Sequence, residues 1–231
     1  MLMTGLPPIF LAMLTGLGAG LLLSMPVGPV NLTILNWATR RGFLAGMLVG
    51  LGASSMELIY CAIAFTGFTK FFEYRMIKTL MEVFTFVFFL LLGLKFLRAK
   101  NLDAPTEFGA AAQKIQARVD EKFHPESAFM TGFIRVLGNF GVLLFWIVLA
   151  ANFLSRDLVA NKLADKAACI AGVALGINAW FCGLSFTASR QCNQFNEPAL
   201  LRLERFSGFC LLALGIAQGI HIAWQLARHR I

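Results

Sequence analysis

The chain has 231 residues, of which 58% are hydrophobic and 14% charged, and its mean hydropathy is +0.72. A soluble domain carries about 25% charged residues, so this composition excludes an ordinary soluble protein and favours an integral membrane protein. The net charge of +8 comes from 20 basic residues that are dispersed along the chain. This dispersal favours anionic lipid headgroups as partners and argues against nucleic acid.

Six apolar segments are long enough to cross a bilayer as helices, which takes roughly 18 or more consecutive apolar residues. The first segment contains no charged residue before Arg40, and its length predicts a retained span rather than a cleaved signal peptide. The sequence therefore predicts an all-α integral membrane protein with six transmembrane helices. The predicted spans are about 9–38, 42–68, 79–98, 129–153, 167–188 and 205–227.

A polar, amphipathic linker at 99–127 divides the chain into two halves, 1–98 and 128–231, whose spans match in order. FTFVFFLLLGL (84–94) in the third span resembles FSGFCLLALGI (206–216) in the sixth. GLGASS in the second span matches ALGINA in the fifth, and PVGP in the first lies where LGNFG (137–141) lies in the fourth. With three spans in each half, the second half must enter the membrane upside down. The halves are therefore predicted to be inverted three-helix repeats, as in many secondary transporters.

The basic residues favour an N-terminus on the outside, because cytoplasmic loops of membrane proteins are enriched in Lys and Arg. In that orientation 12 basic residues lie on the cytoplasmic side and 8 on the opposite side. The expected location is the inner membrane of a bacterial cell, which the chain crosses several times.

The first span contains the sequence SMPVGPVNLTIL (24–35), in which two prolines enclose a glycine. Pro26 and Pro29 lack backbone N–H groups and prevent an unbroken helix, while Gly28 allows a sharp bend or a close approach of another helix. As one straight helix the apolar run would measure about 46 Å, more than the roughly 30 Å hydrocarbon core. We expect two half-helices, with the amides of the second half-helix facing an anionic group and Asn31 just beyond the break. A purely structural kink is the alternative.

Glu57 lies near the middle of the second span, where an ionisable residue is costly and usually functional. Gly46, Gly50 and Ala53 share its helical face, and small residues allow close helix packing, so Glu57 is expected to face the bundle interior. We expect its carboxyl group to exchange a proton or to pair with a cationic group of a substrate, with Arg135 as a candidate partner. A buried structural acid satisfied by hydrogen bonds is the alternative interpretation.

In the second half, Asn139 lies at the position that corresponds to the first break, between Gly138 and Gly141. A helix-breaking cluster is therefore predicted in the fourth span too, with Asn139 as a second binding residue. Asn178 is the strongly polar residue deep in the fifth span, but it lies off the glycine-bearing face and ranks lower. For both residues a structural hydrogen bond between helices is the alternative.

The sequence contains no pattern of metal ligands or catalytic residues. Its five cysteines include no C-x-x-C pair, and the three histidines, His124, His221 and His229, lie far apart. The motifs H-E-x-x-H and G-x-S-x-G and a phosphate-binding glycine loop are all absent. These observations argue against an enzyme, and neither a metal nor another cofactor is expected.

Taken together, these motifs resemble the lysine exporter (LysE/RhtB) superfamily of amino-acid efflux transporters. The resemblance covers nearly the whole chain: PVGPVN (26–31) at the first span is followed by RRGFLAGMLVGLG (40–52), by Glu57 ten residues before Gly67, and by SGFCLLALG (207–215) in the last span. Two positions depart from the family pattern. Val27 is inserted in the proline motif, and Phe140 replaces the proline that usually follows Asn139.

The resemblance implies a secondary transporter that exports an amino acid or a similar small metabolite and uses the proton gradient. Pro26, Gly28, Pro29 and Asn31 are then expected to shape one half of the substrate site and Asn139 the other. The family also implies a homodimer. A cation or metal efflux protein and a membrane scaffold that transports nothing are the two competing functions, and neither explains the broken spans and Glu57 as well.

Overall fold

The computed structural model describes residues 7–26, 28–67, 75–98, 127–190 and 197–228. Every secondary-structure element in these ranges is an α-helix, which confirms the all-helical prediction. The helices are α1 (Pro8–Ser24), α2 (Pro29–Arg41), α3 (Phe43–Gly67), α4 (Arg75–Leu97), α6 (Ala128–Leu137), α7 (Phe140–Ser155), α8 (Leu163–Arg190) and α9 (Glu197–Arg228). The predicted linker at 99–127 lies outside the described residues except for Ser127, which caps α6 by accepting a hydrogen bond from the amide of Met130.

Three described helices are long and apolar enough to cross a membrane by themselves: α3, α8 and the 201–224 part of α9. Two further pairs qualify together, α1 with α2 and α6 with α7, and each pair is sharply bent at a short break. The bend is 75° in the first pair and 69° in the second. The described residues therefore provide up to five spans of a multi-pass membrane protein.

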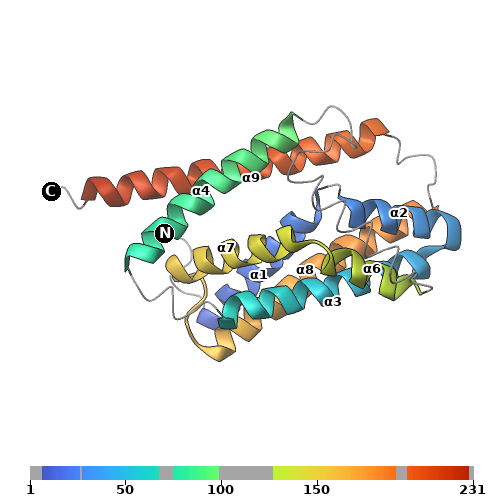
Figure 1. Cartoon of the computed structure of the whole chain (residues 1–231), viewed down its shortest axis with the longest axis horizontal. Coiled ribbons are helices and arrows are strands. Elements are labelled where there is room, and N and C mark those ends of the chain that lie inside the picture. The colour runs from blue at the N-terminus through green and yellow to red at the C-terminus, as the bar shows by residue number, and fades with distance from the viewer. Residues whose placement is uncertain (1–6, 27, 68–74, 99–126, 191–196, 229–231) are drawn as a thin grey trace.

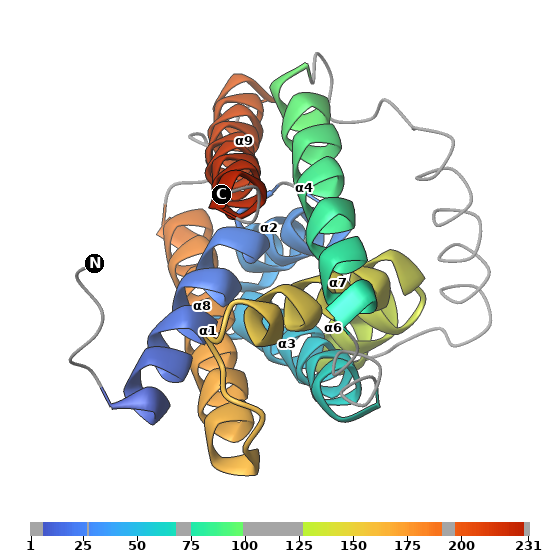
Figure 2. The ribbon, with the colours of Figure 1, turned by 90° about the vertical axis from the view of Figure 1, so that its left-hand side faces the viewer.

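The helices form two groups (Figure 1). Helices α3 and α8 lie at the centre of the larger group, where α1 packs along α8, α6 packs along α3, and α2 contacts both central helices. Helices α4 and α9 form the second group, which packs mainly through its own long interface and approaches the larger group where α4 meets α7 (Figure 2). We use the name α1 pole for the end of the molecule at which α1, α4 and α8 begin and α7 ends. The opposite end, where α2 ends and α3 begins, is the α2 pole.

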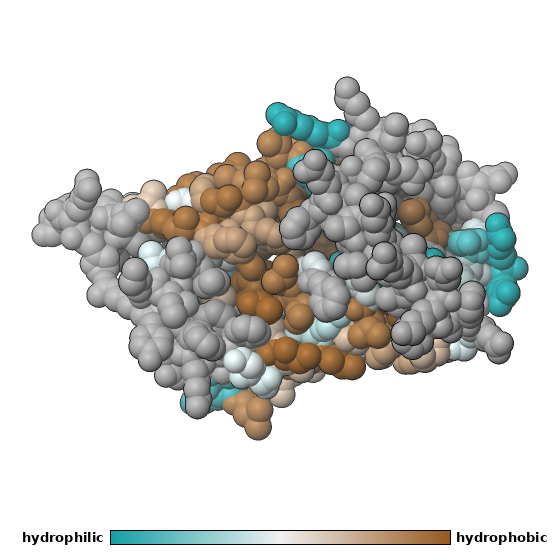
Figure 3. Space-filling model, viewed as in Figure 1, coloured by the Kyte–Doolittle hydropathy of each residue, from teal (hydrophilic) through white to brown (hydrophobic). Residues whose placement is uncertain are grey.

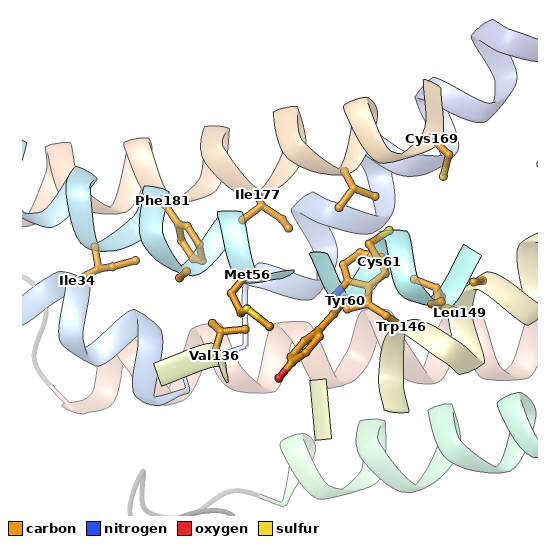
Figure 4. Packing of buried hydrophobic residues seen from close by; sticks show 14 of the residues in the cluster. Ile34, Met56, Tyr60, Cys61, Val136, Trp146, Leu149, Cys169, Ile177 and Phe181 are labelled. Carbon is orange, nitrogen blue, oxygen red and sulfur yellow. The ribbon is translucent and has the colours of Figure 1, made fainter. Parts of the chain in front are cut away.

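Bulky side chains from several helices fill the centre of the larger group (Figure 4). Met56 and Tyr60 of α3 lie close to Val136 of α6, while Ile177 and Phe181 extend toward α3 from α8. All five side chains are buried. This cluster fixes α3 between the second bent pair and α8.

Glycines allow the closest helix contacts, because a side chain at these positions would overlap a neighbouring backbone. A Cβ atom on Gly52 would overlap the carbonyl of Phe129, and one on Gly132 would overlap the carbonyl of Val49, which binds α3 to α6. The same type of contact joins α1 to α8 and α4 to α9. Its members are Gly16 with Cys169, Gly20 with Val173, Gly172 with Met13, Gly176 with Leu17, and Gly208 with Gly93.

Large apolar side chains are also abundant on the outer surface. Figure 3 shows them over much of the described part of one face, with hydrophilic side chains toward the margins. Leu44, Leu91, Phe209 and Ile220 are each more than 60% exposed. Such a surface is stable against lipid chains but not against water, so it agrees with the composition.

The glycine contacts predict a sharp difference between two alanine substitutions. Gly132→Ala should lower the thermal unfolding temperature in detergent, since overpacking at a close contact costs about 1–3 kcal/mol. Gly183→Ala is the matched control, because nothing lies within 4 Å of the added methyl group, and it should leave the unfolding temperature unchanged or raise it. Equal unfolding temperatures for the two variants would contradict the close contact between α3 and α6.

Candidate functional site

The first break separates α1 from α2 where Pro26 and Pro29 predict it. Pro29 is the first residue of α2, a position that suits proline because the missing N–H would have no partner within the helix. No side chain caps this helix start. The first-turn amides of α2 therefore point into the break, where their partial positive charge favours a negative group.

Asn31 supplies the hydrogen bonds that the broken backbone needs. Its side-chain amide donates to the carbonyl oxygens of Ser24, at 2.8 Å, and Pro26, at 2.6 Å. Asn31 is only 4% exposed, and within the described part of the chain its Oδ1 atom is buried and accepts no hydrogen bond. A buried amide oxygen without a donor is costly. The break thus presents an acceptor beside the donors at the start of α2.

Gly28 lies in the first break, directly before α2. Its backbone is extended, with φ −111° and ψ −177°, a conformation that any residue adopts. No helix approaches closely either, because a Cβ atom added at Gly28 would have nothing within 4 Å. The chain does bend by 75° at the break that contains Gly28, but the expected close approach of another helix is absent here, and the glycine leaves open space next to the break.

The second break separates α6 from α7 and has Asn139 at its centre. Asn139 precedes the first residue of α7, and its side chain makes no capping hydrogen bond. The freed carbonyl of Leu137 accepts a hydrogen bond of 2.9 Å from the hydroxyl of Tyr60, which reaches across from α3. At both breaks a polar side chain thus partners the interrupted backbone, as a lipid environment requires.

Glu57 lies on α3 one turn before Tyr60, and its side chain is half-buried. Within the described residues its carboxylate has no hydrogen-bond or ion-pair partner. Arg135 is on α6, and no ion pair joins it to Glu57 in this part of the chain, so their pairing stays a prediction. A carboxylate without a partner at this depth can bind a cation or a proton.

Asn178 is closer to this region than its lower rank suggested. Its side-chain amide donates to the hydroxyl of Ser54 on α3 and to the carbonyl of Ala174, both at 2.8 Å, and its Oδ1 is buried without a donor among the described residues. Ser54 is one turn before Glu57. Helix α3 therefore carries Ser54, Glu57 and Tyr60 at three-residue spacing, and hydrogen bonds join Ser54 to Asn178 of α8 and Tyr60 to the second break.

Ser54 and Tyr60 were not among the predicted site residues. The signal that was available is their spacing, since each is three residues from Glu57 on a helix. No group of three or more His, Cys, Asp or Glu side chains that could hold a metal ion occurs in the described ranges.

Comparison with known proteins identifies the family. Residues 21–220 match the LysE type translocator family. The chain belongs to this family. It is also 28% identical over 207 residues to the "Putative amino acid efflux protein YcgF" of Bacillus subtilis (strain 168), a match that covers 90% of this chain and 94% of that protein. No solved structure matches the chain.

A translocator moves its substrate without transforming it, so this family member is a transporter and not an enzyme. Both bent pairs lie largely or wholly inside the matched range of residues. The polar groups described above are therefore part of the translocator domain itself.

The hydrogen bonds of Asn31 predict a loss of stability when its amide is removed. Asn31→Ala leaves two carbonyl groups of the break without a donor, and it should lower the free energy of unfolding by about 1–3 kcal/mol. Asn36→Ala is the control, because Asn36 is exposed on the same helix. Thermal unfolding in detergent compares the two variants. If both unfold at the same temperature, Asn31 does not hold the break.

Proposed function

We propose that the protein is a secondary active transporter that exports an amino acid or a similar small metabolite and is driven by the proton gradient. The observation that carries the proposal is the pair of interrupted spans, each with its freed backbone partnered by a polar side chain. In secondary transporters, substrate sites lie near the midplane between such half-helices. The matched relative from Bacillus subtilis is named for amino acid efflux, which agrees with this substrate class.

The proposed architecture is six spans in two inverted three-helix repeats, 1–98 and 128–231, joined by the linker at 99–127. Corresponding contacts in the two halves support it. In the alignment of GLGASS with ALGINA, Gly52 corresponds to Gly176, and each packs on a carbonyl of the broken span of the opposite half. The contact of Gly52 with Phe129 corresponds to that of Gly176 with Leu17. The contact of Gly132 with Val49 likewise corresponds to that of Gly20 with Val173.

Helix α4, with 23 residues, serves as the third span in this proposal and corresponds to α9. The two helices are antiparallel, and their contacts correspond to one another when the partners are exchanged, as expected around a two-fold axis. The contact of Gly93 with Leu212 corresponds to that of Gly215 with Leu90. The contact of Gly208 with Leu97 corresponds to that of Gly219 with Phe86. The hydrogen bond between Ser54 and Asn178 joins two further corresponding residues, which supports an axis of the proposed repeat that runs between α3 and α8.

In the proposed site, the amides at the start of α2 bind the carboxylate of the substrate, and the half-helix that starts after Asn139 faces it from the second repeat. The free oxygen of Asn31 accepts a hydrogen bond from the substrate's ammonium group. Pro26 and Pro29 hold the break open, and Gly28 leaves the space in which the substrate sits. This arrangement places each charged end of a zwitterion beside a group of opposite polarity.

Glu57 is the proposed proton carrier. Its carboxyl group has no partner among the described residues, and it is one turn from both Ser54 and Tyr60 on α3. When the substrate leaves, a proton can occupy the carboxylate, so that the return step moves a neutral group through the lipid-embedded core. The proposed location is a bacterial inner membrane with the N-terminus outside, where inward proton movement drives export.

The test is amino acid efflux from proteoliposomes under an imposed pH gradient. The wild-type protein should release a loaded amino acid faster with the gradient than without it, and Glu57→Gln should lose this acceleration while retaining gradient-independent exchange. Glu57→Asp keeps a carboxyl group and should retain part of the acceleration.

Two outcomes would contradict the proposal. A Glu57→Gln protein that responds to the pH gradient like the wild type would exclude the proton role of Glu57. Efflux of divalent cations, but of no amino acid in a panel of neutral, basic and acidic ones, would replace the proposed substrate class with metal export.

A further inference from the structure

Helices α4 and α7 meet through a polar cluster at the α1 pole. The two helices run antiparallel: Phe88 and Phe89 lie 5.6 and 6.4 Å from the ring of Phe145 in the middle of the contact, and Glu82 lies near Arg156 at its end. Glu82 is only 8% exposed. Burial lowers the pKa of the Arg156 guanidinium from its ordinary value, and the Glu82 carboxylate opposes this shift.

Three donor atoms at the end of α7 lack acceptors. The Nε and Nη2 atoms of Arg156 and the Nδ2 atom of Asn152 are buried and have no hydrogen-bond partner in the described part of the chain. Asn152 lies one turn before Arg156 and seven residues after Phe145, so all three share the face of α7 that meets α4. Glu82 therefore provides the negative charge that this end of α7 faces.

The corresponding place in the other half also contains an acid. Extending the alignment of 84–94 with 206–216 by two residues pairs Glu82 with Glu204 of α9. One carboxylate oxygen of Glu204 is buried without a partner among the described residues. The helix that corresponds to α7 is α2, and its last turn carries two basic residues, Arg40 and Arg41. Arg41 lies over the ring of Trp37 at 4.4 Å.

The two poles differ in one respect. At the α1 pole α4 packs against α7, whereas α9 and α2 are not among the described helix pairs that pack against each other. Figure 1 shows the same difference, since α4 descends toward the larger group at its N-terminal end while the opposite ends of α4 and α9 stay apart from α2. In a transporter built from inverted repeats, two equivalent interfaces lie on opposite sides of the membrane. In each state of the alternating-access cycle one of them is closed and the other is open.

We propose that Glu82 and Arg156 hold the α1 pole closed, and that Glu204 with Arg40 and Arg41 closes the α2 pole in the other state of the cycle. The inference rests on the proposed transport function and adds to it the groups that control access. The α4–α9 pair is the moving unit, because its own interface is extensive while its contact with the larger group, mainly at α7, is much smaller among the described residues. Rocking of this pair closes one pole as it opens the other.

The test measures access to the α1 pole in nanodiscs, where a reagent reaches both faces of the membrane. Ser155→Cys places a thiol beside the cluster at a site that is 8% exposed, and its rate of reaction with a charged maleimide reports opening. Glu82→Gln and Arg156→Gln, each added to this background, should accelerate labelling about tenfold, the effect of a tenfold shift in the population of the open state. The wild-type chain without Ser155→Cys gives the labelling of its own five cysteines.

Three further variants make the result decisive. Exchange of the charges, Glu82→Arg with Arg156→Glu, should return labelling toward the rate of the Ser155→Cys parent, because the attraction across the interface is restored. Glu204→Gln should leave labelling at Ser155→Cys unchanged or slow it. Asp157→Asn is the surface control, since Asp157 is exposed next to Arg156, and it should have no effect.

Unchanged labelling in both Glu82→Gln and Arg156→Gln would overturn the proposal, as would an equal acceleration in Asp157→Asn. Thermal unfolding of each variant separates opening of the pole from misfolding, and Arg156→Gln carries the test if Glu82→Gln does not fold. Labelling requires no substrate. The labelling result can therefore be interpreted even if the protein shows no amino acid efflux. Unchanged labelling rates would likewise leave the efflux result valid.

Discussion

The constraint on which the structure depends is that backbone groups inside a membrane must find partners within the protein. Pro26 and Pro29 interrupt a helix within an apolar segment of the chain, and the carbonyls that the break frees need hydrogen-bond donors. Asn31 donates to two of them, and Tyr60 donates to the carbonyl of Leu137 at the second break. Both breaks are therefore stable local structures that position helix ends and polar atoms away from the membrane surface.

This constraint connects the packing to the proposed transport cycle. Close glycine contacts bind α1 to α8 and α6 to α3, so the first half of each broken span is fixed to a long helix of the opposite half of the chain. Of the second halves, α7 packs against α4, and in the proposed cycle α2 meets α9 in the other state. The proposed cycle combines a rigid core, which has its polar groups at the breaks, with a pair of helices that rocks against α2 or α7. Such rocking exposes a central site to each side of the membrane in turn.

The sequence predicted the features that depend on local chemistry. Helices follow from the long apolar runs, and the first break follows from two prolines, because proline stops a helix wherever it occurs. Gly28 shows the limit of such reasoning: a glycine between prolines suggested a sharp bend or a close approach of another helix, and the chain bends there, but no helix approaches and the residue leaves space.

The missed residues all act through contacts between segments that are distant in the chain. The partner of Tyr60 is 77 residues away and that of Ser54 is 124 residues away, and no local pattern in a single sequence encodes either pair. Glu82 lies near the start of the predicted span 79–98, and its side chain is only 8% exposed because of helix packing that the local sequence does not encode. The proposed internal repeat offered a signal here, since it pairs Glu82 with Glu204.

The central claim is that the first break encloses a space that admits a small zwitterion. The most direct test is a single thiol at Gly28→Cys, because the structure leaves open space around this position. We expect this thiol to react with a small hydrophilic maleimide and to be protected by an amino acid that the protein transports, whereas d-glucose gives no protection. A thiol that reacts equally fast with and without every amino acid in the panel, or that does not react at all, would contradict the account.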